Sequence, residues 1–136
     1  MNDDVVLKWI LKAENDLKTA FDEVSSYEPA YDMVCFHLQQ CAEKYLKAYL
    51  IFHNQEITKT HNISFLLNQC LRIESGFEQF IGEQTDRLTY YAVEARYPDD
   101  FYMPTHEESQ QALEIVESLK QFIFPKIRPV KNKEVQ

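Results

Sequence analysis

The sequence predicts an all-α protein, built as an up-and-down bundle of four to five helices. Only two of the 136 residues are glycine, and the helix-favouring residues Ala, Leu, Glu, Gln and Lys are abundant. Nowhere do β-branched and polar residues alternate over a long stretch, as they would in a half-exposed strand. Apolar residues recur instead three and four positions apart, which is typical of amphipathic helices.

The length suits one hydrophobic core and is too short for two. We predict one helical bundle over residues 3–124, followed by a basic tail over residues 125–136. The tail contains two prolines and the only basic run of the chain, so we interpret it as a flexible, solubilising end. The basic residues of this run are Lys126, Arg128, Lys131 and Lys133.

The first helix is predicted to begin with Asp3 or Asp4 as its N-cap and to end near Val24. Trp9 is expected to lie in the core. A turn containing Pro29 follows, and we expect the first two helices to form an antiparallel hairpin. The apolar residues that recur along the first helix are Val6, Trp9, Ile10, Ala13, Leu17, Ala20, Phe21 and Val24.

The second helix, predicted over about residues 31–53, carries both a core side and a polar stripe. At about 100° per residue, four polar side chains fall within about a quarter-turn of one another. Phe36 and Ile51 lie on or beside this stripe, so we expect the stripe to meet a ligand or a second subunit. The polar stripe consists of His37, Gln40, Lys44 and Lys47, and the core side of Val34, Leu38, Ala42, Tyr45, Tyr49 and Phe52.

A third helix is predicted from about residue 63, with Thr60 or Asn62 as its cap. Ser75 and Gly76 read as its stop signal, because glycine after a helix can adopt the left-handed conformation. The apolar residues of this helix are Ile63, Leu66, Leu67, Cys70 and Leu71.

The fourth helix follows, with a possible break near Gly82, and is predicted to end before Pro98 because the residue preceding a proline avoids the helical region. The fifth helix has the clearest start signal of the chain. Thr105 and Glu108 form a capping box, in which each side chain accepts a hydrogen bond from the other's backbone amide. This helix is predicted to end before Pro125.

The formal net charge of -8 disfavours a non-specific hold on nucleic acid, although a local basic pocket is compatible with it. Cys35, Cys41 and Cys70 are odd in number and lack a Cys-x-x-Cys pair, which argues against a disulfide framework and a thiolate zinc site. The acidic N-terminus is unlike a secretory signal, and no apolar run has the length of a membrane span. We therefore expect a cytoplasmic protein without a membrane segment.

The histidines His37, His53, His61 and His106 include no pair at the spacing of a same-helix metal site, so we predict no metal and no cofactor. The most informative segment for binding is 90–100, which puts three tyrosines, Arg96 and two aspartates at a helix end. Tyrosine and arginine together suit stacking and phosphate contact with a nucleotide. The alternative is structural, with the tyrosines in the core and Arg96 paired with an aspartate.

Three segments, in this order, resemble the HEPN domain family. They are residues 37–50, with the pattern Gln-x-x-Glu-Lys-x-x-Lys-Ala, then Thr60-His61-Asn62-Ile63, then Ala95-Arg96-Tyr97-Pro98-Asp99. The resemblance covers residues 3–124. It implies a helical bundle that forms a homodimer and partners a minimal nucleotidyltransferase, often in a toxin-antitoxin-like pair. Some relatives are metal-independent ribonucleases, in which an Arg and a His four to six residues apart act on the RNA backbone.

This chain departs from the ribonuclease pattern. Arg96 and His106 have nine residues between them, and the five-residue gap from Lys47 to His53 has lysine in place of arginine. Whether the chain is an enzyme therefore stays open, and the candidates for catalysis are Arg96 with His106 or His61. The ligand-binding residues that the resemblance implies for a nucleotide- or RNA-binding module are Gln40, Lys44, Lys47, Arg96 and Tyr97.

Each of these side chains also has a structural interpretation. Lys47 can pair with Glu43 one helical turn back, and Lys44 can pair with Asp99 or Asp100 from another helix. We prefer the binding interpretation over two alternatives, a metal-independent ribonuclease toxin and an interaction scaffold that binds no ligand.

Overall fold

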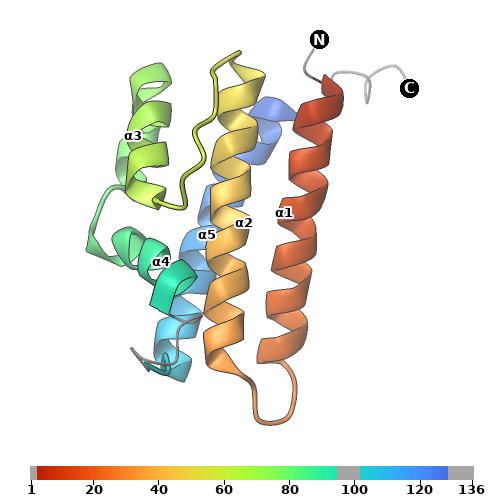
Figure 1. Ribbon diagram of the computed structural model, residues 1–136, viewed down its shortest axis with the longest axis vertical. Coiled ribbons are helices and arrows are strands. Elements are labelled where there is room, and N and C mark those ends of the chain that lie inside the picture. The colour runs from red at the N-terminus through yellow and green to blue at the C-terminus, as the bar shows by residue number, and fades with distance from the viewer. Residues whose placement is uncertain (1–2, 95–101, 129–136) are drawn as a thin grey trace.

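The computed structural model describes residues 3–94 and 102–128 of the chain, and those residues contain helices and no strand (Figure 1). The predicted all-α bundle is confirmed. Five α-helices and one short 3-10 helix, η1, follow one another. Their bounds are α1 Asp3–Val24, α2 Tyr31–Phe52, α3 Ile63–Ile73, η1 Ser75–Phe80, α4 Glu83–Glu94 and α5 His106–Ile127.

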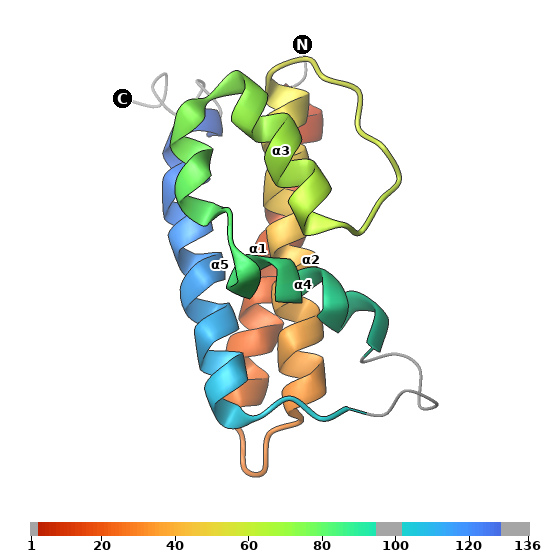
Figure 2. The same ribbon diagram turned by 90° about the vertical axis from the view of Figure 1, so that its left-hand side faces the viewer.

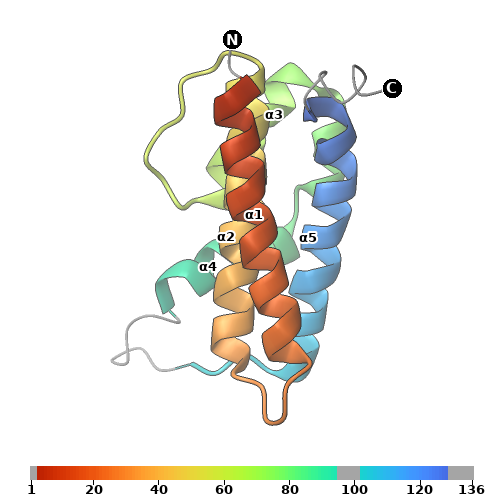
Figure 3. The same cartoon turned by 90° about the vertical axis from the view of Figure 1, so that its right-hand side faces the viewer.

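Helix α2 is the centre of the bundle. It contacts α1, α3, α4 and α5, and Figures 1 and 3 show α1 and α5 running along it while α3 and α4 cover another side. Its predicted core side is buried apart from Phe52, which is half-buried. Because helices surround α2, several residues outside that predicted side are buried as well. These additional residues are Cys35, Gln39, Cys41, Glu43, Leu46, Lys47, Ala48 and Leu50.

The predicted antiparallel hairpin of α1 and α2 is also confirmed (Figure 3). Both acidic residues expected to cap α1 lie inside its first turn. Trp9 is not fully in the core: its large ring is half-buried at the edge, and the Lys47 Nζ atom lies 5.7 Å from the ring centroid. Phe21, near the end of α1, is 40% exposed.

Helix α3 begins as expected, with the Asn62 side chain accepting a hydrogen bond from the backbone amide of Phe65 at 2.9 Å. It ends near the predicted stop, but the reason given for the stop was wrong. The backbone already leaves the helical conformation at Glu74, and Gly76 has no positive φ. Gly76 instead provides space, since a Cβ atom there would lie 2.8 Å from Cζ of Phe122.

The fourth helical region is broken near Gly82, as the sequence suggested: η1 ends at Phe80 and α4 begins at Glu83. Helix α4 crosses α2 (Figure 2) and is described as far as Glu94. The predicted end of this helix before Pro98 falls in segment 95–101, outside the described residues.

The capping box of α5 is present, with Glu108 Oε1 accepting from the Thr105 amide at 2.8 Å. The prediction that α5 ends before Pro125 was wrong, because the helix continues to Ile127. Proline removes one hydrogen-bond donor, yet the amide of Arg128 still donates to the carbonyl of Phe124 at 3.0 Å. Ile127 is buried, so packing favours the extra turn.

Replacing Thr105 with alanine should lower the free energy of unfolding by about 1 kcal/mol, because the amide of Glu108 loses the hydroxyl oxygen that it donates to at 3.1 Å. Urea denaturation of the wild type and the variant measures the difference. Thr19→Ala is the matched control, since this exposed threonine lies inside α1 and its hydroxyl only donates back to the carbonyl of Asn15. An equal loss in both variants would contradict the capping role.

Candidate functional site

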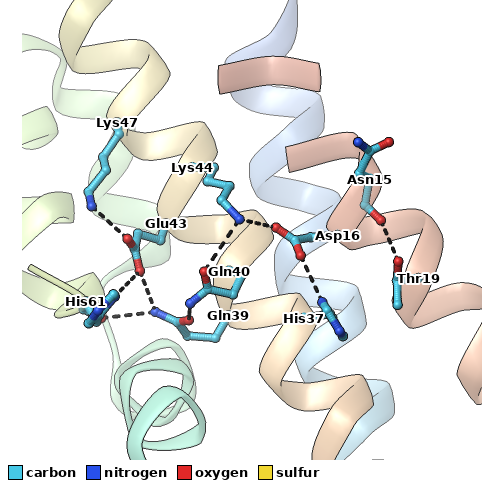
Figure 4. Close-up of polar contacts among 10 residues, drawn as sticks. All are labelled: Asn15, Asp16, Thr19, His37, Gln39, Gln40, Glu43, Lys44, Lys47 and His61. Atoms are coloured by element: carbon cyan, nitrogen blue, oxygen red, sulfur yellow. Dashed lines mark hydrogen bonds and ion pairs between the residues drawn. The ribbon is translucent and has the colours of Figure 1, made fainter. Parts of the chain in front are cut away.

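The polar stripe of α2 is part of a continuous hydrogen-bonded network between α1 and the segment that leads into α3 (Figure 4). We call it the α2 network. Its centre is a direct contact between neighbouring amides, in which Gln40 Nε2 donates to Gln39 Oε1 at 2.7 Å. One half of the network surrounds Asp16 of α1, and the other half surrounds Glu43 of α2.

In the first half, the carboxylate of Asp16 bridges two members of the stripe. His37 Nδ1 lies 2.8 Å from Asp16 Oδ1, and Lys44 Nζ lies 2.5 Å from Asp16 Oδ2. Lys44 Nζ is also 3.5 Å from Gln40 Oε1. The sequence predicts Asp99 or Asp100 as the carboxylate partner of Lys44, and both lie outside the described residues; the partner that the structure describes is Asp16 of α1.

In the second half, Glu43 accepts three hydrogen bonds. Its Oε2 atom is 2.7 Å from Lys47 Nζ, and its Oε1 atom is 2.9 Å from His61 Nδ1 and 3.1 Å from Gln39 Nε2. The pairing of Lys47 with Glu43, considered from the sequence as a structural alternative, is therefore present. Gln39 also donates to the carbonyl oxygen of His61 at 3.1 Å, which fixes the segment before α3 against α2.

The Glu43 half of the network contains a buried ion pair between Glu43 and Lys47. The side chains of Glu43 and Lys47 are only 5% and 8% exposed. Burial by itself opposes ionisation, yet the hydrogen bonds from Lys47, His61 and Gln39 hold the pKa of the Glu43 carboxyl below its usual range. The Glu43 carboxyl is thus ionised near neutral pH and lies 2.7 Å from the ammonium group of Lys47, whose charge it balances inside the protein.

This arrangement limits what the α2 network can do chemically. Lys44 and Lys47 each lie against a carboxylate, so their charges are largely compensated before any phosphate approaches. The His61 side chain, at 59% exposed, is the most accessible member of the Glu43 half. His61 is therefore the group of this half that can reach a bound molecule, held in place by a buried carboxylate.

The remaining candidates lie elsewhere or outside the described residues. Arg96 and Tyr97 belong to segment 95–101, which the structure does not describe. His106 is the first residue of α5, and its Nδ1 atom lies 3.1 Å from the hydroxyl of Tyr31. His106 and His61 thus have different neighbours, and no hydrogen bond or ring contact within the described part of the chain joins them.

Sequence reasoning missed Asp16 and Gln39. Asp16 carried a usable signal, because it lies on α1 between the core residues Ala13, Leu17 and Ala20 and so had to face a neighbouring helix. Gln39 is fully buried although it is polar. Its role follows from the position of the His61 carbonyl, which only the tertiary structure brings to it.

A metal centre and a reactive thiol find no support in residues 3–94 and 102–128. No group of three or more His, Cys, Asp or Glu side chains in these ranges is arranged to hold a metal ion. Burial raises the pKa of the thiols of Cys35 and Cys70 to about 12, so neither forms a reactive thiolate near neutral pH. None of the described helices has the length and apolar character needed to cross a membrane.

The comparison with known proteins identifies the family. The sequence matches the model of the HEPN domain over residues 6–127. The fold is similar to the crystal structure of TT1696 from Thermus thermophilus, with a TM-score of 0.74, 25% identity and coverage of 93% of this chain and 99% of that one. It is also similar to ST0689, an archaeal HEPN homologue, with a TM-score of 0.63, 27% identity and coverage of 90% and 97%. No curated protein gives a significant match. This chain belongs to the HEPN domain family.

Proposed function

We propose that this HEPN chain is a non-catalytic module that forms a homodimer, binds a minimal nucleotidyltransferase in a toxin-antitoxin-like pair and contacts nucleotide or RNA. One observation supports the proposal that the chain is not catalytic. The cations of the polar stripe are compensated within the chain, Lys44 by Asp16 and Lys47 by Glu43. Such lysines stabilise the wall of a site, whereas a phosphate-cleaving centre needs a cation free to meet the developing charge.

Within this proposal the residues of the candidate site have different roles. Arg96 and Tyr97 are the direct ligand contacts, because guanidinium and phenol groups suit phosphate and base recognition. Gln40 and Lys44 contribute the half-buried edge of the site. Lys47 acts through Glu43, whose carboxylate orients the accessible imidazole of His61.

Co-purification tests the partner. When the chain is produced together with the nucleotidyltransferase encoded beside its gene, the two proteins should co-elute, and light scattering of the chain alone should give the mass of a dimer. Binding of ATP, measured by calorimetry, should weaken at least about tenfold in Arg96→Ala, as expected for loss of a charged hydrogen bond of about 1.5–3 kcal/mol. Arg128→Ala is the control and should bind as the wild type does.

A monomer that binds neither the nucleotidyltransferase nor ATP would overturn the proposal. The non-catalytic part has its own test, which uses RNA incubated with the isolated protein in the presence of a chelator. Intact RNA is expected. Cleavage that disappears in Arg96→Ala and in His61→Ala or His106→Ala would instead identify a metal-independent ribonuclease.

A further inference from the structure

A second candidate site lies between α4 and the residues around the start of α5, and it shares no lining residue with the α2 network. It is an open pocket of about 490 Å³. Three tyrosines line it, together with three carboxylates and one guanidinium group. These residues are Tyr90, Tyr91 and Tyr102, then Glu83, Asp86 and Glu108, and Arg87. We call it the tyrosine pocket.

The tyrosine rings present aromatic surface to the pocket. Tyr90 and Tyr102 meet edge to face, with their ring centroids 6.1 Å apart and their planes at 72°. They remain 44% and 41% exposed, although large aromatic side chains are usually buried. The face of a tyrosine ring carries partial negative charge and attracts cations placed within about 6 Å of its centroid.

Hydrogen bonding reinforces this negative character. The Tyr102 hydroxyl donates to Glu108 at 2.7 Å, which shifts electron density toward the ring. Glu108 stays ionised because this bond and the backbone amide of Thr105 hold the pKa of its carboxyl below the usual range, although partial burial opposes the effect. The phenol and the carboxylate therefore act together as one negative wall of the pocket.

The charges of the lining residues favour a positively charged ligand over a negatively charged one. Glu83, Asp86 and Glu108 outnumber Arg87, whose Nη1 atom lies 3.8 Å from a Glu108 oxygen. A phosphate would meet an excess of carboxylates here, whereas an ammonium or guanidinium group would gain from both the carboxylates and the ring faces. This preference is opposite to that of a nucleotide-phosphate site.

We propose that the tyrosine pocket binds an organic cation, an ammonium or guanidinium group, held between the rings of Tyr90 and Tyr102 and the carboxylates of Glu83 and Glu108. The cation can be supplied by a free polyamine or by a basic side chain of a protein segment. Both sources share the same recognition chemistry, and affinity for two probes distinguishes them.

The probes are spermidine and a peptide of residues 126–136, which contains the basic run of this chain. Calorimetry at low ionic strength should detect saturable binding of at least one probe, and the tighter probe identifies the source. Tyr90→Leu should weaken binding about threefold to thirtyfold, and Tyr90→Phe should retain it. Tyr27→Leu is the control, because Tyr27 is a 91% exposed tyrosine on the turn between α1 and α2.

Arg87 provides the decisive variant. If the pocket binds a cation, Arg87→Gln should tighten binding by about fivefold, since it removes a like charge. Circular dichroism should show that each variant keeps the helical content of the wild type. Binding that weakens in Arg87→Gln, or no saturable binding of either probe to the folded wild type, would overturn the proposal.

Discussion

Glu43→Gln should lower the free energy of unfolding by about 3–5 kcal/mol, the usual result of removing one partner from a buried ion pair. The substitution keeps the shape of the side chain and removes its charge. The ammonium group of Lys47, 2.7 Å from the carboxylate and only 8% exposed, would then lack a counter-charge. His61 and Gln39 would also lose the charged acceptor that they share. Urea denaturation followed by circular dichroism measures the loss.

Two further variants test the physical reason. Asp22→Asn removes the acid of another lysine pair with four-residue spacing, Lys18 with Asp22, which is 76% and 68% exposed. This control should show no measurable change, because water screens an exposed pair. Adding Lys47→Met to Glu43→Gln should recover part of the stability, since the orphaned charge is then removed as well. A double variant that is less stable than Glu43→Gln would rule out this explanation.

Glu43 should also make the free energy of unfolding depend on pH. The pKa of Glu43 is lower in the folded protein than in the unfolded chain, so its charged form contributes stability above the unfolded pKa. That contribution is lost as the pH falls through the folded value. The difference in stability between the wild type and Glu43→Gln should therefore shrink as the pH falls from about 6 toward about 3. A difference that grows on acidification would contradict the assignment.

Local signals were sufficient for most of the fold. The Asn62 cap and the Thr105 capping box each depend on residues at most three positions apart, and both are present. The predictions that were wrong concern positions at which tertiary packing determines the backbone conformation. Pro125 is a strong local signal to end a helix, but burial of Ile127 outweighs it, and Gly76 is needed for the approach of Phe122 rather than for a left-handed turn.

The candidate site was less predictable for the same reason. The sequence identified the polar stripe of α2, because its members are close in sequence and share one face. Asp16, which pairs with Lys44, is 28 positions away in the sequence, on α1. His61, which pairs with Glu43, is 18 positions away, in the segment before α3. These pairings depend on the register between two helices and on the path of a loop, neither of which is encoded by local spacing.

The two glycines of the chain should respond oppositely to alanine, although both lie in the region between α3 and α4. Gly76→Ala should lower the free energy of unfolding by about 1–3 kcal/mol, a typical cost of overpacking. The added Cβ would lie 2.8 Å from Cζ and 3.1 Å from Cε1 of Phe122. That ring cannot yield easily, because it packs edge to face against Phe77 and Phe80 with centroids 4.9 and 5.5 Å away.

Gly82→Ala should leave stability unchanged or raise it by up to about 1 kcal/mol. Apart from the two neighbouring residues in the chain, no atom of the described residues lies within 4 Å of a Cβ added at Gly82, and its φ is not positive, so alanine meets neither a clash nor backbone strain. Alanine also restricts the unfolded chain more than glycine does, which favours folding. The denaturant midpoints of Gly76→Ala and Gly82→Ala, each compared with that of the wild type, measure the two changes in stability. Equal destabilisation would mean that backbone freedom, rather than contact with Phe122, requires glycine at position 76.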